Sequence, residues 1–265
     1  MPTLSISATR IGRSRSRPAK LVRRIPALAA LIAVAILCAA PVQAAPLLAE
    51  RRADGPVERL VARMEARNPF FRVMFQDHPA ERRGFIGALE AARRNGGVRA
   101  MQLMAVRYGA HMGRKYFPYY IARTSDDAAR GYVRFVADTL TFLRLGSHDD
   151  CYAFLAGSAR ERARVLALLN AEERRRMLNV LAAVVVGSRS ARSIKDGPNA
   201  YRRPLQAVIQ RVTDRLGRDN MVRWRPGLVG DDRAKACDFA LAFYEEILKR
   251  PAREGALVAR GVLGG

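Results

Sequence analysis

Five residues in two short segments could do chemistry: His148, Asp149 and Cys151 in the first segment, and Cys237 and Asp238 in the second. An imidazole that is held by a carboxylate can take up a proton near neutral pH, which is the task of a general base in hydrolysis. Two cysteines on different helices can instead form a disulfide. The two segments are therefore the first candidates for a functional site.

The first segment also has the form of a helix start. Ser147 precedes it, and Asp150 stands three residues later, in the position of a capping-box acid. A serine hydroxyl and a carboxylate at this spacing satisfy backbone N–H groups of the first helical turn. We favour this interpretation over a catalytic one, and a disulfide is compatible with both.

Signatures of several enzyme classes are missing from the sequence. It contains no G-x-S-x-G, no phosphate-binding G-x-x-x-x-G-K-[ST], no G-x-G-x-x-G, no H-E-x-x-H and no paired C-x-x-C. These patterns accompany serine hydrolases, nucleotide-binding proteins and common zinc sites. We therefore expect no bound metal and no cofactor, and we regard a binding protein as a better expectation than an enzyme.

A resemblance to a known family gives the alternative. The pattern His148-Asp149-x-Cys151-Tyr152, followed by Cys237-Asp238, resembles small secreted calcium-dependent phospholipases. The resemblance implies that the two cysteines bond, that His148 activates a water, that Asp149 binds calcium and that Asp238 orients the imidazole. These enzymes also have a glycine-rich calcium loop upstream, where this chain has the helical pattern of residues 131–138. The alternative function is thus a lipid-acting hydrolase.

The first 44 residues are typical of a secretory signal peptide. Seven basic residues and no acid precede an apolar run over residues 25–40, and an A-x-A-like cleavage site follows at Val42-Gln43-Ala44. An uncleaved membrane anchor is the alternative, but the apolar run is short for a membrane span. We expect cleavage after Ala44, a single helical domain over residues 45–265, and a periplasmic or secreted location.

Export would place the cysteines in an oxidising compartment. Cys151 and Cys237 are the only cysteines after the signal segment, and both lie on apolar faces of expected helices. Disulfides form and persist in oxidising compartments. We therefore predict a Cys151–Cys237 disulfide between two helices.

The chain is strongly cationic. It contains 47 Lys and Arg against 24 Asp and Glu, and removal of the seven basic residues before Ala45 leaves 40 against 24, a net charge of +16. In a cell envelope this charge favours phospholipid headgroups, lipopolysaccharide phosphates, anionic glycans or an acidic protein as partners, and not nucleic acid. The plainer alternative is that the arginines are solvated helix faces.

A marked excess of positive charge lies between Arg189 and Arg225, where ten basic residues stand against three acids. Trp224 lies there too, between two arginines, which suits a headgroup-level anchor or a stack of arginine on tryptophan. The predicted anion-binding surface comprises Arg189, Arg192, Arg202, Arg203, Arg211, Arg215, Arg223, Trp224 and Arg225.

Apolar residues recur at spacings of three and four almost throughout, so the sequence predicts an all-α protein, an irregular multi-helix bundle. Breaks are expected at Asn68-Pro69, at Asn95-Gly96-Gly97 and at Phe117-Pro118, and helix starts at Pro79, Ser125 and Asn170. His111, on a Met-rich face, is expected to be buried. The last strong helix, residues 231–250 with Cys237, resembles helical proteins that Gram-negative bacteria export, a likeness that implies no activity.

Overall fold

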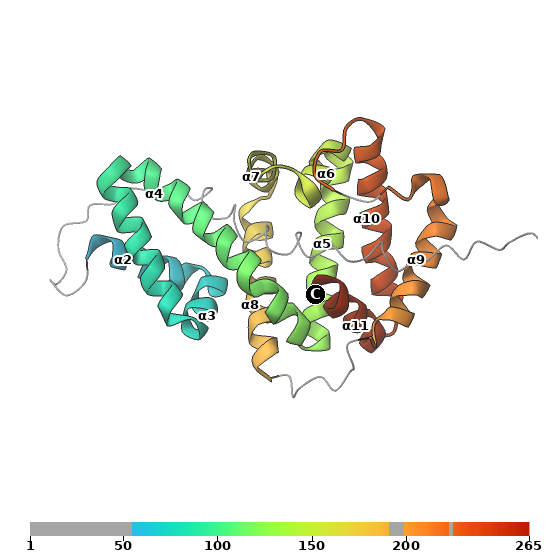
Figure 1. Ribbon diagram of the computed structural model, residues 1–265, viewed down its shortest axis with the longest axis horizontal. Coiled ribbons are helices and arrows are strands. Elements are labelled where there is room, and N and C mark those ends of the chain that lie inside the picture. Colours follow the sequence, from blue (N-terminus) through green and yellow to red (C-terminus); the bar gives the residue numbers. More distant parts are fainter. Residues whose placement is uncertain (1–54, 191–198, 223–224, 265) are drawn as a thin grey trace, which may run out of the picture.

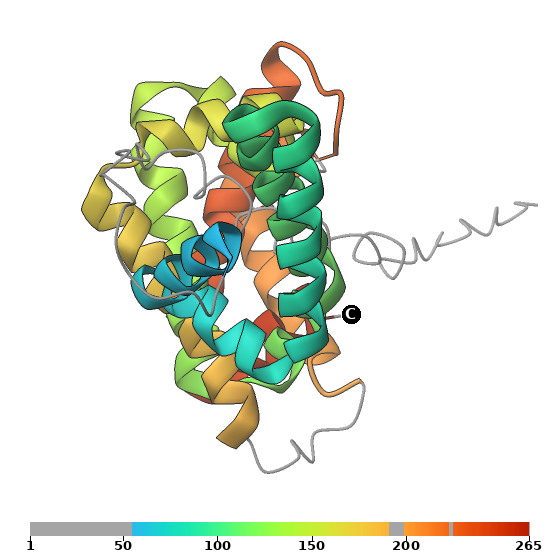
Figure 2. The ribbon, with the colours of Figure 1, turned by 90° about the vertical axis from the view of Figure 1, so that its left-hand side faces the viewer.

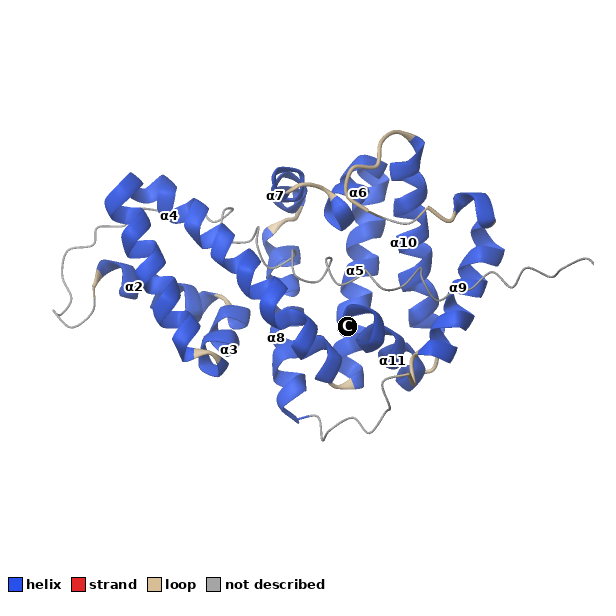
Figure 3. Cartoon of the chain, viewed as in Figure 1, coloured by secondary structure: helices blue, strands red, loops and turns tan. Residues whose placement is uncertain are grey.

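The computed structural model describes residues 55–190, 199–222 and 225–264, and every regular element in these ranges is helical. Figure 3 shows the helices and the short loops that join them. The helices, in chain order, are α2 (Pro56–Arg67), α3 (Pro69–Asp77), α4 (Pro79–Arg123), α5 (Asp126–Gly146), α6 (His148–Ala156), α7 (Ala159–Leu168), α8 (Ala171–Ser190), α9 (Arg202–Leu216), the 3-10 turn η3 (Arg218–Asn220), α10 (Asp231–Lys249) and α11 (Ala252–Leu263). The predicted all-α class is confirmed.

Helices α5 and α10 form the centre of the bundle and lie side by side in the right half of Figure 1. Both are long amphipathic helices whose apolar sides are wide enough to contact several neighbours. Helix α5 also packs against α6, α8 and α11, whereas α10 carries α9 on its other side. The buried apolar residues of all these helices belong to one core cluster.

Helices α2 and α3 cover the other part of the molecule together with α4, and α3 packs against α8. Asn68 begins α3, and its side chain accepts a hydrogen bond from the N–H of Phe71. Phe70 and Phe71, which follow this break, are buried in the core. Figure 2 shows these helices in front of the rest of the bundle.

Helix α4 is a helical hairpin. Its backbone leaves the helical region at Gly96 and at Gly97, where φ is 61°, a left-handed value that glycine adopts at little cost. After this turn the second half runs back diagonally across the molecule (Figure 1). The two halves contact each other, because the ring of Tyr108 lies 5.0 Å from that of Phe85.

Two local expectations were wrong. Pro118 does not turn the chain, because α4 continues through it to Arg123 while the neighbouring Phe117, Tyr120 and Ile121 are buried in the core. Burial of these three large side chains offsets the loss of one helical hydrogen bond at proline. His111 is exposed instead of buried, although the adjacent Met112 is buried.

Helix starts that depend on local capping were predicted correctly. Ser125 accepts a hydrogen bond from the N–H of Ala128 at the start of α5. Asn170 accepts from the N–H groups of Glu172 and Glu173 at the start of α8, and Glu173 bonds back to the N–H of Asn170. Each pattern satisfies backbone donors that have no partner within the helix.

Candidate functional site

The two segments that could do chemistry meet at the contact between α6 and α10. Cys151 on α6 and Cys237 on α10 form a disulfide, their Cα atoms 5.8 Å apart, and both residues are fully buried. The predicted disulfide between helices is therefore present. It points to an oxidising compartment, since such bonds persist there.

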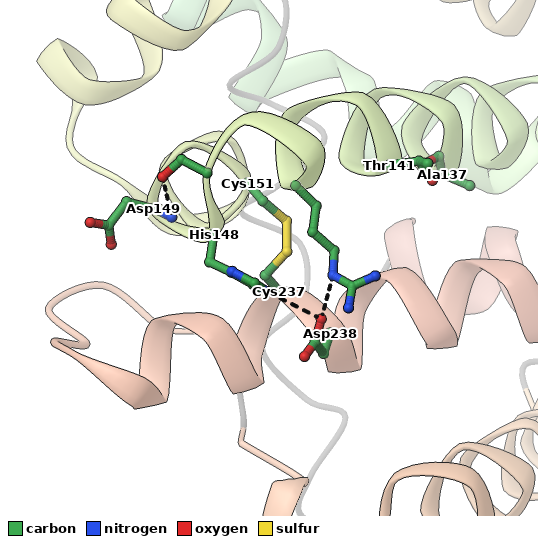
Figure 4. The surroundings of a disulfide bond; sticks show 9 residues. Ala137, Thr141, His148, Asp149, Cys151, Cys237 and Asp238 are labelled. Atoms are coloured by element: carbon green, nitrogen blue, oxygen red, sulfur yellow. Dashed lines mark hydrogen bonds and ion pairs between the residues drawn. A yellow bond between two sulfur atoms is a disulfide. The ribbon is translucent and has the colours of Figure 1, made fainter.

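The disulfide brings His148 and Asp238 to the same side of the α6–α10 contact. The Nε2 atom of His148 lies 3.8 Å from Oδ1 of Asp238, and Figure 4 shows the ring directed towards this carboxylate. The distance is an ion-pair distance and too long for a hydrogen bond. The same oxygen lies 2.7 Å from Nε of Arg144, so Asp238 already has a cationic partner.

Asp149 points away from His148 and Asp238 in Figure 4. Its carboxylate, which is 64% exposed, lies 3.3 Å from the guanidinium of Arg233. Arg233 also donates to the carbonyl of Leu228 at 2.6 Å and lies over the ring of Tyr152 at 4.8 Å. One guanidinium thus links α6, α10 and the loop that precedes α10.

Calcium, which the phospholipase resemblance implies, does not fit the residues around Asp149. A calcium ion needs six to eight oxygen ligands. Here the guanidinium of Arg233 already donates hydrogen bonds to the carboxylate of Asp149 and to the carbonyl of Leu228. The glycines of this loop, Gly227 and Gly230, have positive φ values. Among the described residues, no group of three or more His, Cys, Asp or Glu side chains is arranged to hold a metal.

Helix-start geometry is present at the same place. The hydroxyl of Ser147 accepts from the N–H of Asp149 at 3.1 Å, as expected of an N-cap. Asp150 does not complete the capping box, because its carboxylate pairs with Arg164 of α7 at 2.5 Å. The capping interpretation is thus confirmed for Ser147 and wrong for Asp150.

An open pocket of about 540 Å³ lies between the start of α6 and the start of α10. Its wall includes His148, Asp149, Arg233 and the exposed Val229. A pocket of this volume is large enough for a small molecule or a lipid headgroup. Its charged groups are of both signs, so the pocket itself does not select a purely anionic ligand.

The chain was compared with protein-family models, with curated proteins and with solved structures. No match was found in any of the three comparisons. The site has to be interpreted from its own geometry.

The predicted anion-binding surface is divided between different parts of the fold. Arg192, Arg223 and Trp224 lie outside the described residues. Arg189 is at the end of α8, where it pairs with Asp77 of α3 at 2.6 Å. Arg215 pairs with Glu245 of α10 at 2.5 Å.

Four members of that surface have no ion pair with any described carboxylate: Arg202, Arg203, Arg211 and Arg225. The first three lie on α9 and are exposed, whereas Leu205, Val208 and Val212 on its other side are buried. Helix α9 packs its buried side against α10 and α11. Its outer side therefore carries three exposed arginines.

A polar network between α3 and α4 was not anticipated from the sequence. The hydroxyl of Tyr120 lies 2.7 Å from Nε2 of His78 and 3.0 Å from the carboxylate of Asp77, and the ring of His78 stacks on Tyr116. Burial lowers the pKa of His78 below its usual value. Residues 77 to 120 are too far apart in the sequence for spacing to predict this contact.

Glu81 is the second centre of this network and joins the two halves of the α4 hairpin. It accepts hydrogen bonds from Lys115, Tyr116 and Tyr108, each at 2.7 Å. The bond from Lys115 and those from the two tyrosines lower the pKa of Glu81 to about 2. The network ties secondary structure together, and we assign no chemistry to it.

Proposed function

We propose that the protein is exported to the cell envelope and binds an anionic surface there, with the outer face of α9 as a contact. The observation that carries the proposal is the set Arg202, Arg203 and Arg211, exposed on one helix with no described carboxylate paired to them. Unpaired arginines are available to phosphate or carboxylate groups, and arginine can bind such groups through two parallel hydrogen bonds. The disulfide and the N-terminal segment support an envelope location.

The test compares two triple variants of the exported protein. Arg202→Gln, Arg203→Gln and Arg211→Gln together remove three charges from α9, whereas Arg83→Gln, Arg134→Gln and Arg175→Gln remove three exposed arginines from three other helices. Binding is measured at low salt to heparin, as a soluble polyanion, and to vesicles that contain phosphatidylglycerol. Each arginine near an anionic membrane contributes about 1 kcal/mol, so the α9 variant is expected to bind roughly 100-fold more weakly.

The control variant is expected to lose much less affinity, because its arginines do not lie together. Binding must also weaken as salt screens the charges. Equal losses in the two variants, or no binding of the wild type to either probe, would overturn the proposal.

A second candidate, a hydrolase that acts on lipids, is favoured by one observation: the His148–Asp238 pair at 3.8 Å beside an open pocket. In such a reaction the imidazole would take a proton from water while the water oxygen attacks the ester carbonyl. The ester C–O bond would then break and the imidazolium would give its proton to the leaving alkoxide, so that the products are a fatty acid and an alcohol. Because Arg233 occupies Asp149, we route no step through calcium. Fatty-acid release from phospholipid that persists with a chelator and is lost in His148→Asn, but not in the exposed variant His111→Asn, would support this candidate over simple binding.

A further inference from the structure

The second half of α4 and the turn before it form an unusually basic surface. Between Glu90 and Asp126 the chain has no acid and seven basic residues. Lys115 pairs with Glu81, and Arg123 lies over the ring of Tyr119 at 4.0 Å. The other five are exposed and have no ion pair with any carboxylate in the described ranges: Arg93, Arg94, Arg99, Arg107 and Arg114.

Two large apolar side chains lie among these arginines and point into solvent. Val98 is 64% exposed directly after the Gly96–Gly97 turn, and Leu103 is 53% exposed. Leu103 stands four residues after Arg99 and four before Arg107, and residues at this spacing lie above one another on one helix face. Arg99, Leu103 and Arg107 thus follow one another on the side of α4 that faces solvent.

The turn is well placed to reach a flat surface. It lies at the upper left of Figure 1, at one extremity of the described helices. Contacts of Tyr108 with Phe85 and Glu81 hold the two halves of the hairpin together, so the position of its tip is fixed relative to the two helices. We call Arg93, Arg94, Val98, Arg99, Leu103 and Arg107 the α4 tip surface.

Helix α9 lacks the apolar component. The described residues with large exposed apolar side chains include Val98, Leu103 and Tyr119 of α4 but none of α9. A helix face that carries arginines alone can attract an anionic partner. Where arginines surround exposed apolar side chains, those apolar side chains can also insert below the lipid headgroups. The combination distinguishes a lipid surface from a soluble polyanion.

We infer that the α4 tip surface is the part of the protein that inserts into an anionic lipid bilayer. This inference rests on the proposed binding of an anionic surface and names the lipid bilayer as that surface. Arg93, Arg94, Arg99 and Arg107 contact lipid phosphates, while Val98 and Leu103 enter the boundary between headgroups and acyl chains. Helix α9 then contributes long-range attraction, and Val98 and Leu103 of the α4 tip surface contribute the contact that salt does not screen.

The experiment measures sedimentation of the exported protein with vesicles of equal parts phosphatidylglycerol and phosphatidylcholine, at about 0.05 M and about 0.5 M NaCl. Val98→Ser with Leu103→Ser is compared with Phe142→Ser and Leu145→Ser, two exposed apolar residues of α5. We expect wild-type binding to persist in part at high salt and the α4 variant to lose roughly tenfold in affinity there, because apolar burial is not screened. The α5 variant is expected to bind like the wild type.

The α9 triple variant separates this inference from the proposed function. It is expected to lose binding to heparin and to vesicles at low salt, while the α4 apolar variant keeps its binding to heparin. Unchanged high-salt vesicle binding in the α4 variant, or an equal loss in the α5 variant, overturns the inference but leaves the proposed function standing. Binding to heparin without any binding to vesicles also overturns it, because the partner would then be a soluble or protein polyanion.

Discussion

At the scale of single residues, the pairing of each carboxylate decides what the pocket beside His148 can do. Asp149 is held by Arg233 and Asp238 by Arg144, so two residues that could serve hydrolysis already have cationic partners. Both pairs are partly exposed, and such pairs contribute little to stability. Their effect on chemistry is larger, because a paired carboxylate is a weaker ligand for a metal and a weaker acceptor for an imidazole.

Glu81 gives a prediction at the same scale. Its pKa of about 2 lies below the ordinary value of 4.5, so the bonds to its carboxylate stabilise the fold above pH 4.5 and are lost as the pH falls towards 2. We expect Glu81→Gln to lower the free energy of unfolding at pH 7 by roughly 1–3 kcal/mol, since a charged acceptor of three hydrogen bonds is removed. The difference in the free energy of unfolding between Glu81→Gln and the wild type must become smaller as the pH falls.

Urea unfolding at pH 7, 4 and 3 measures this difference. Glu172→Gln, an exposed residue whose side chain makes none of these bonds, is the control and is expected to change stability by less than about 0.5 kcal/mol. A Glu81→Gln penalty that is the same at every pH would show that the charge of Glu81 contributes nothing.

At the scale of elements, the disulfide holds α6 against α10 across 86 residues of sequence. Closing so long a loop restricts the unfolded chain, which stabilises the folded state by about 4 kcal/mol in the chain-entropy view. We expect Cys151→Ala with Cys237→Ala to lower the free energy of unfolding by about this amount. Titration of the unfolded, unreduced protein with a thiol reagent must find no free thiol after the signal segment, and two free thiols would contradict the bond.

Packing of α8 against the α4–α5 junction depends on Gly187. A Cβ atom there would lie 2.6 Å from Oγ1 of Thr124, whose hydroxyl is bonded to the carbonyl of Val184. Gly131 of α5, in contrast, has nothing within 4 Å of such a Cβ. We expect Gly187→Ala to destabilise by about 1–2 kcal/mol through crowding, and Gly131→Ala to stabilise by about 0.5–1 kcal/mol through helix propensity.

Thermal unfolding of both glycine variants checks this prediction. The pair is matched, because each change adds one methyl group to a helix. Stabilisation by both substitutions would mean that α8 can move away from Thr124 and that the contact is not tight.

The elements could be predicted where their signals are local. The caps at Ser125 and Asn170 and the break at Gly96-Gly97 depend on a few neighbouring residues, and the sequence indicated each of them. The break predicted at Pro118 is absent, because the local preference of proline for a break is outweighed by the burial of Phe117 and Tyr120. That burial depends on the whole core. Local rules fail where tertiary burial supplies the larger free energy.

At the scale of the whole molecule, the candidate site was predictable only in part. The disulfide followed from two cysteines and an expected compartment. The pairing of Asp149 with Arg233, 84 residues away, could not follow from spacing. The α4 tip surface could have been found, because a stretch of basic residues without a single acid is visible in the sequence; only the exposure of Val98 and Leu103 required the structure.

Export is the last prediction at this scale. The basic and apolar order of residues 1–44, which lie outside the described residues, predicts cleavage after Ala44, so the exported protein should begin at Ala45. None of the helices in the described ranges could span a membrane. N-terminal sequencing of the protein from the periplasmic fraction measures the cleavage site.

A protein that still begins at Met1 and sediments with the inner membrane would contradict cleavage and would make residues 25–40 an anchor. Binding through the α4 tip would then act on a surface to which the chain is already tethered, and vesicle binding by the separated residues 45–265 would still report it.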